Sequence, residues 1–195
     1  MKTTYKDSQY YPLFLSELKE MLWVEQKLWG MLRLIQGVAQ SPDFSRTLAQ
    51  SRVHTSAHID HIRHIFGMLE ETAESVESAA MAKLIQSVEL TVSKTEQNQA
   101  AGDFPLIMAT QKAGQFKIAC YENLITISQI LGNEAASDVL EGNIVEDLGT
   151  DLLLRELSQR YILKEAAIRE PDAKPEKAPG RRLAFSKRQP ASDVE

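Results

Sequence analysis

All four histidines of this chain fall within one short segment, from His54 to His64. His54 and His58 stand at positions i and i+4, so on a helix both imidazoles can reach a single metal ion. His61 falls on the same side, whereas His64 is rotated by about 120° from His58 and should be more exposed. The alternative is a helix that buries one imidazole and leaves the other three in solvent. The spacing therefore indicates a candidate metal site and does not establish one.

Charged residues also interrupt the apolar stripes of three other segments. Glu25 stands in the middle of the first stripe, Asp147 and Asp151 share the apolar face of the last, and Lys117 interrupts the third. A carboxylate in a protein core is costly unless it is paired or bound to a cation. A mixed set of imidazoles and carboxylates suits iron, manganese or zinc. The candidate metal ligands are Glu25, His54, His58, Asp147 and Asp151.

Four long segments carry apolar residues at the spacings of three and four that are typical of amphipathic helices. The first opens at Pro12, and the second follows Ser41-Pro42-Asp43. The third runs from Asp103-Phe104-Pro105 to a helix-ending glycine, Gly132, and the fourth runs from about residue 134 to about 168. A shorter amphipathic stretch, AAMAKLIQSVELTVS, lies in the long link between the second and third segments. No segment alternates apolar and polar residues in the manner of a half-buried strand.

This pattern predicts an all-α protein, a four-helix bundle of residues 1–169 with one short extra helix in a connection that crosses the bundle. Residues 170–195 are rich in proline and charge and offer little to bury, so we expect a disordered tail. The tail is more basic than the rest of the chain, whose overall net charge is −5. Nucleic-acid binding is therefore expected only as a weak contact through the tail.

Composition and missing motifs narrow the classes of function. The chain has one cysteine, Cys120, which cannot form an internal disulfide, and it shows neither a signal peptide nor a membrane-spanning apolar stretch. A cytoplasmic location with no membrane association is the expectation. No glycine-rich phosphate loop, nucleophile elbow or CxxC motif is present. We therefore identify no catalytic residue and no small-molecule substrate, and an enzymatic activity is not expected.

The chain resembles the YciE/YciF-like branch of the ferritin-like superfamily over about residues 10–165. "LKEMLWVEQKL" is similar to the first helix of that family, whose glutamate falls at Glu25, and "HTSAHIDHIRHIFGMLEE" resembles its second helix. "AMAKLI" matches the short helix, "ATQKAGQFKIACYENL" the third long helix, and "VEDLGTDLLL" the fourth. The resemblance implies a ferritin-like bundle with a di-iron or di-manganese centre, association with stress, and a homodimer.

The same comparison shows where the expected metal ligands have changed. A glutamate of the family's second helix becomes His54, and the two acidic residues of its third helix become Gly114 and Lys117. On the fourth helix a glutamate has shortened to Asp147. A ferritin-like site takes a Glu from each of two helices and a Glu-x-x-His from each of the other two, and this chain offers fewer carboxylates.

Two functions remain open from the sequence. In the first, the protein is a structural or partner-binding bundle in which the Lys117 ammonium takes the charge position of a lost metal and meets Asp147, Asp151 or Glu25, with His54 and His58 as hydrogen-bonding neighbours. In the second, the altered ligand set still binds iron, manganese or zinc and retains redox or metal-handling activity.

Overall fold

The computed structural model describes residues 5–98, 100 and 102–169, and all regular structure in these ranges is helical. In chain order the elements are η1 Tyr5–Asp7, α1 Tyr11–Val38, α2 Pro42–Met68, α3 Ala79–Gln97, α4 Phe104–Ile130 and α5 Glu134–Arg169. The predicted all-α class, the four long helices and the short helix after residue 78 are confirmed. The predicted disordered tail, residues 170–195, lies outside the described residues.

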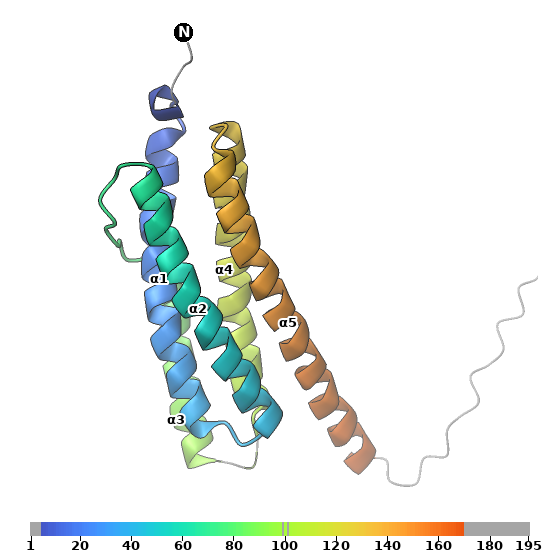
Figure 1. Ribbon diagram of the computed structural model, residues 1–195. Helices are drawn as coiled ribbons and strands as arrows, with labels where there is room; N and C mark the ends of the chain where they lie inside the picture. The colour runs from blue at the N-terminus through green and yellow to red at the C-terminus, as the bar shows by residue number, and fades with distance from the viewer. Residues whose placement is uncertain (1–4, 99, 101, 170–195) are drawn as a thin grey trace, which may run out of the picture.

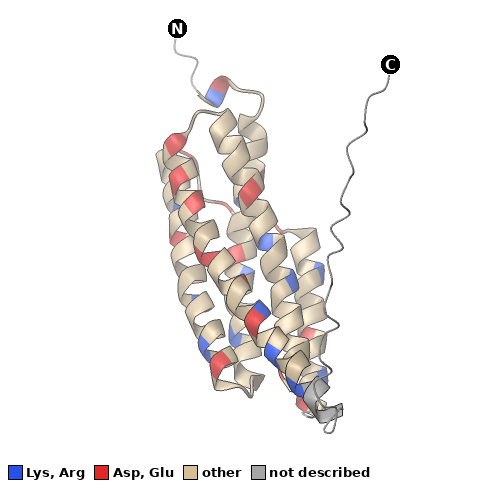
Figure 2. Cartoon of the chain, turned by 90° about the vertical axis from the view of Figure 1, so that its right-hand side faces the viewer, with Lys and Arg blue, Asp and Glu red and all other residues tan. Residues whose placement is uncertain are grey.

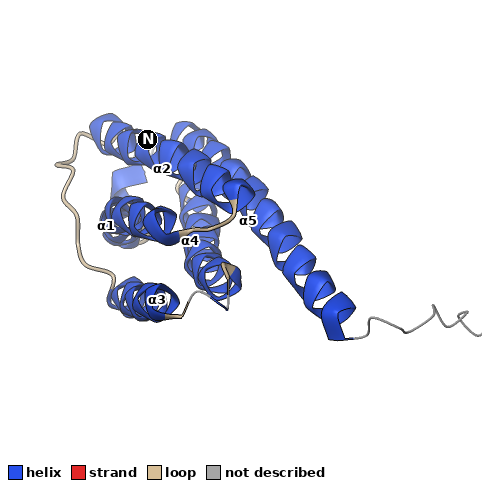
Figure 3. Cartoon of the chain, turned by 90° about the horizontal axis from the view of Figure 1, so that it is seen from below, coloured by secondary structure: helices blue, strands red, loops and turns tan. Residues whose placement is uncertain are grey.

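The four long helices form the bundle, and α3 packs outside it. Helix α1 packs against α2 and α4, and α5 packs against α4 and α2, while α3 contacts α1 and α4. Seen from one end, α3 lies beside α1 and α4, and the C-terminal part of α5 diverges from the bundle (Figure 3). Because α3 returns the chain along the bundle, α2 and α4 run in the same direction (Figure 1). This is the long crossover connection of ferritin-like bundles.

Local sequence explains where the helices begin and end. The hydroxyl of Ser41 accepts a hydrogen bond from the backbone N–H of Phe44, and Pro42 occupies the first turn of α2. After α4, Gly132 has a φ of +67°, the left-handed conformation in which a glycine commonly ends a helix. The buried carboxylate of Asp103 accepts hydrogen bonds from the backbone N–H groups of Gln40 and Ser41, at 2.8 and 2.6 Å. Asp103 thereby ties the α1–α2 link to the start of α4.

Apart from Asp103 at the start of α4, the buried charged residues lie in one polar zone near the middle of the bundle. Phenylalanines and aliphatic side chains such as Phe14, Ile35, Phe44 and Leu140 are fully buried above and below that zone. On the outside, acidic and basic residues are interspersed along the helices (Figure 2). None of the described helices combines the length and apolar character that a bilayer span requires. The functional candidates therefore lie in the polar zone of the core.

Candidate metal centre and buried ion network

A buried lysine lies between two buried carboxylates from two other helices. The Lys117 ammonium on α4 is 2.8 Å from Asp147 Oδ1 on α5 and 3.1 Å from each oxygen of Glu25 on α1. All three side chains are buried in the bundle. Charged groups in such a place are stable only when the partners are close and their remaining hydrogen-bonding groups are satisfied. The sequence predicted that Lys117 would meet Asp147, Asp151 or Glu25, and its ammonium lies against Asp147 and Glu25.

The imidazole of His58 connects this network to the surface. Its Nδ1 lies 3.1 Å from Glu25 Oε1 and its Nε2 lies 3.0 Å from Glu146 Oε2. The His58 side chain is fully buried, whereas 44% of the Glu146 side chain is exposed. An ionised carboxylate only accepts hydrogen bonds, so both contacts form together when both ring nitrogens carry protons. His58 thus joins a fully buried carboxylate to one that solvent reaches.

Two further polar side chains complete the hydrogen bonding around Glu25. The Tyr121 hydroxyl donates to Glu25 Oε1 at 2.5 Å, and it accepts a hydrogen bond from Asn143 Nδ2 at 3.2 Å. Asn143 Oδ1 in turn lies 2.7 Å from His61 Nδ1. Glu25 therefore has an ammonium, an imidazole and a phenol as partners, which offset the cost of its burial.

The network shifts the pKa values of its members in different directions. Burial alone would raise the pKa of Glu25, but the Lys117 charge and the hydrogen bonds from His58 and Tyr121 outweigh burial and lower it. Burial opposes the charge of Lys117, yet Glu25 and Asp147 together raise the lysine pKa above its ordinary value. For Asp147 burial prevails over the lysine, and its pKa is raised. The Lys117–Glu25 pair is therefore the firmly ionised part of the network.

The structure brings together only part of the predicted ligand set. Glu25, His58 and Asp147 each place one donor atom within 4.8 Å of the others. His54 Nδ1 is 3.9 Å from Glu146 Oε2 and makes no hydrogen bond with the described residues. Its predicted hydrogen-bonding role beside the lysine is therefore not observed. Asp151 lies apart from the cluster, and its Oδ2 accepts from Arg155 Nε at 2.6 Å.

Sequence reasoning missed three members of the network. Glu146 contacts His58 and Tyr121 contacts Glu25, whereas Asn143 joins the network through Tyr121. Tyr121 and Asn143 lie on the same helix faces as Lys117 and Asp147, four residues from each, and that spacing is the signal that could have found them. Glu146 is rotated by about 100° from Asp147, where a glutamate ordinarily faces solvent.

The residues present do not fit a two-metal centre. Such a centre takes carboxylates from all four helices, and α4 contributes the Lys117 ammonium instead. That ammonium lies within 3.1 Å of two of the three clustered donors. A metal ion among Glu25, His58 and Asp147 would be repelled by the Lys117 ammonium, whose pKa is raised so that it stays charged. One ion could bind there only if the lysine moved away or lost its proton.

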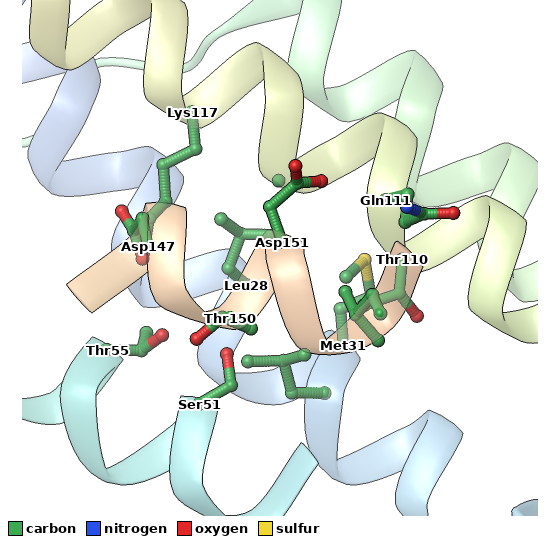
Figure 4. Close-up of a pocket in the computed structure, with 13 residues that line it drawn as sticks. Leu28, Met31, Ser51, Thr55, Thr110, Gln111, Lys117, Asp147, Thr150 and Asp151 are labelled. Atoms are coloured by element: carbon green, nitrogen blue, oxygen red, sulfur yellow. The ribbon is translucent and has the colours of Figure 1, made fainter. Parts of the chain in front are cut away.

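A small cavity lies beside Lys117. Its volume is about 40 Å³, and it is lined by Asp147, Asp151 and Thr55 together with Gly114 and apolar residues of α1. Figure 4 shows Asp147 and Asp151 on α5 between hydroxyl groups from α2 and the side chains of α4. Glu25 and His58 do not line it. Lys117 and Asp147 thus belong both to the ion network and to the lining of the cavity.

Comparison with known proteins agrees with this fold. The chain is 28% identical to the protein YciF of Escherichia coli over 133 residues, 63% of this chain and 79% of YciF. The crystal structure of that E. coli stress protein superposes with a TM-score of 0.73 at 25% identity, covering 84% of this chain and 99% of YciF. YcfI from Rhodopseudomonas palustris superposes with a TM-score of 0.71 at 21% identity, covering 76% and 94%, and shows the fold alone.

A family model described as a domain of unknown function, DUF892, matches residues 10–167. That range spans α1 to α4 entirely and all of α5 except its last two residues. The bundle, the crossover helix and the match along the sequence agree with one another, and this chain therefore belongs to the YciF-like DUF892 family.

Proposed function

We propose that this protein is a ferritin-like bundle in which a lysine has replaced the charge of a di-metal centre, and that it acts as a structural or partner-binding protein. The observation that carries the proposal is the Lys117 ammonium, which lies 2.8 Å from Asp147 and 3.1 Å from Glu25. Metal ions in a bundle core neutralise the carboxylates that hold them. Here one ammonium performs that neutralisation, so the fold is held together without a redox-active ion.

The wider setting of the proposal comes from the relatives. YciF is described as a stress protein, and YcfI as a candidate structural protein. By this likeness we propose a stress-associated role in the cytoplasm. A homodimer is supported by an apolar stripe on α5, where Val145, Leu148 and Leu152 are 66%, 48% and 59% exposed. Light scattering after gel filtration measures the dimer directly, and a monomer at all concentrations would remove that part of the proposal.

Iron loading tests the proposed replacement. Untagged protein is incubated with ferrous iron under anaerobic conditions, desalted and analysed for metal, and we expect no stoichiometric iron. The double variant Gly114→Glu, Lys117→Glu restores acidic residues to α4 and removes the ammonium, so it should take up iron. Two equivalents of iron in the unaltered protein would overturn the proposal. Failure of the double variant to bind iron would show that Lys117 is not what excludes it.

A second function is favoured by one observation, the clustering of Glu25, His58 and Asp147 donor atoms within 4.8 Å. If Lys117 moved aside, an imidazole and two carboxylates could hold one iron, manganese or zinc ion. The ion would supply Lewis-acid or redox chemistry, and these side chains would hold it at the centre of the bundle. Under this alternative the protein handles metal or retains a redox activity.

The metal-binding alternative makes its own prediction. Ligand imidazoles must be neutral, so affinity should fall steeply as the pH drops through the histidine range. His58→Ala should abolish binding, and His64→Ala, which alters an exposed residue, should leave it unchanged. Isothermal titration with zinc measures both. Equal losses in the two variants would indicate nonspecific binding by the histidine run, and the alternative would then fail.

A further inference from the structure

The cavity beside Lys117 carries polar atoms that have no hydrogen-bond partner among the described residues. Asp147 Oδ2, Asp151 Oδ1 and the Thr55 hydroxyl are buried and make no hydrogen bond with any described residue. The side chains of Asp147 and Asp151 are only 8% and 9% exposed. Unpaired buried oxygens are rare in native proteins, because each loses its hydration without gaining a partner. All three residues line the same cavity.

The charges around this cavity do not balance. Its lining residues include two carboxylates, those of Asp147 and Asp151, and one ammonium, that of Lys117. The two carboxylates that face the cavity share their cations with other groups or with solvent, since Lys117 also serves Glu25 and the Arg155 side chain is 59% exposed. A single positive charge is what this side of the core lacks.

The donors and the volume select the kind of cation. Carboxylate and hydroxyl oxygens are ligands of hard cations, and the cavity offers no thiolate or imidazole among its lining residues. Further hydroxyl groups come from Ser51 and Thr150, which line it with Thr55 (Figure 4). A volume of about 40 Å³ holds one ion with one or two waters. Magnesium retains several waters and needs more room, whereas an alkali cation exchanges its hydration shell more readily for protein oxygens.

The position of Gly114 explains why the cavity exists. A Cβ atom built on Gly114 would have no neighbour within 4 Å, so the missing side chain leaves open space between α4 and α5. Glu25, His58 and Tyr121 do not line this space. The cavity therefore adjoins the cluster of donors considered above for iron, manganese or zinc, and it shares Asp147 with that cluster.

We propose that this cavity is a binding site for one monovalent alkali cation, sodium or potassium, held by the free oxygens of Asp147 and Asp151 and by the Thr55 hydroxyl. The cation supplies the charge that Lys117 cannot provide to both carboxylates. The inference rests on the proposed function in one respect, namely that Lys117 stays in the core as an ammonium. Beyond the proposed function, the inference adds a bound cation, and the stability of the folded protein should therefore depend on which salt is present.

Thermal unfolding in matched salts tests this site. Protein freed of divalent metals with EDTA is melted in sodium, potassium or choline chloride at one fixed ionic strength, because choline is too large for the cavity. Ligand binding to the folded state alone raises the melting temperature, by about 3–6 °C at a tenfold excess over Kd for a chain of this size. We expect that rise in sodium or potassium relative to choline. Equal melting temperatures in all three salts would overturn the proposal.

Two variants and a direct measurement sharpen the test. Asp151→Asn keeps an oxygen for Arg155 but removes the charge, and it should lose most of the salt-specific rise. Asp138→Asn, an exposed change on the same helix, should keep it. Sodium NMR linewidths should broaden with unaltered protein and sharpen again when potassium is added, and this measurement does not depend on any variant folding. Absence of broadening, or a full rise retained in Asp151→Asn, would refute the site.

Divalent cations give the remaining outcome. If millimolar calcium or magnesium raises the melting temperature and the alkali cations do not, the monovalent assignment is wrong. Failure of the proposed function has a separate signature, which is two equivalents of iron after loading. Iron binding would not affect the salt test, because the salt test uses protein from which EDTA has removed metal ions.

Discussion

Replacing Lys117 removes the only ammonium in contact with the described carboxylates of the buried core. In Lys117→Ala the carboxylates of Glu25 and Asp147 lose contacts of 3.1 and 2.8 Å and remain buried. Breaking a buried ion pair from one side costs roughly 3–5 kcal/mol. Protonation gives an independent figure, since holding one carboxyl neutral at pH 7 when its unfolded pKa is about 4 costs about 4 kcal/mol. The two figures agree, so we expect a loss of about 4 kcal/mol.

The sign of the pH dependence follows from the same protonation. In the unaltered protein the raised Lys117 pKa adds stability that is complete below its ordinary value of 10.5 and is lost as the pH rises through the folded-state pKa. The lowered Glu25 pKa adds stability that is present above 4.5 and is lost as the pH falls through the folded-state pKa. Without the lysine, burial raises the pKa of both carboxyls, so acid stabilises the variant. Its deficit should shrink by about 3 kcal/mol between pH 7 and pH 5 if one proton is taken up.

Urea unfolding at pH 7 and pH 5 measures both effects. Lys117→Met retains most of the buried stem and isolates the charge from the packing, and Lys112→Ala alters an exposed lysine one turn earlier on α4, where we expect a change within about 0.5 kcal/mol. A loss below about 1 kcal/mol in Lys117→Met at pH 7 would refute the buried-pair reasoning. A deficit that is the same at both pH values would refute the protonation argument.

The remaining predictions concern single contacts. Asp103→Ala removes the acceptor of two backbone amides in the α1–α2 link and should lower the free energy of unfolding in urea by about 1–3 kcal/mol. Its control, Asp138→Ala on the exposed face of α5, should lower it by at most about 0.5 kcal/mol. Equal losses in the two variants would contradict the proposed role of Asp103 in joining the α1–α2 link to α4. Tyr121→Phe deletes a 2.5 Å hydrogen bond to a buried carboxylate and should cost about 1–3 kcal/mol, and a neutral result would show that water replaces the hydroxyl. Gly114→Ala should stabilise the protein by about 0.5–1 kcal/mol, because helix propensity improves and the new Cβ meets no neighbour within 4 Å. Gly149→Ala, on the exposed face of α5, is its matched control. If Gly114→Ala lowers the free energy of unfolding and Gly149→Ala does not, the new Cβ of residue 114 displaces something from the cavity.

Most of the fold could be predicted from the sequence because the helix boundaries rest on local chemistry. Ser41 and Pro42 begin α2, and Gly132 ends α4, through conformational preferences that need no tertiary contact. The spacing of apolar residues then predicts which face of each long helix is buried. The role of Asp103 was not predictable in this way, because its partners, Gln40 and Ser41, lie about 60 residues earlier in the chain.

The candidate site could be predicted only where a charge interrupts an apolar stripe. Glu25 and Lys117 are conspicuous on that criterion, and both are buried. His58 also interrupts an apolar stripe and is fully buried, whereas the depth of His54 depends on the rotation of α2 against α5, which helical spacing fixes only coarsely. Glu146 gives no signal, because a partly exposed glutamate on a helix is ordinary, and only its 3.0 Å contact with a histidine of another helix makes it part of the network.

The ion network joins residues of α1, α4 and α5 at one height in the bundle, and this has a consequence for folding specificity. Apolar stripes look much alike from one turn to the next, so two helices can slide by a turn, about 5.4 Å, and still bury aliphatic side chains. Such a slide would separate Lys117 from Glu25 and Asp147 and leave charges in an apolar layer. We therefore expect these three residues to select one alignment of the helices, at some cost in stability relative to an all-apolar core. Under the proposed replacement of a metal centre by Lys117, the bundle keeps its alignment without an ion, because the lysine distinguishes the native alignment from its neighbours.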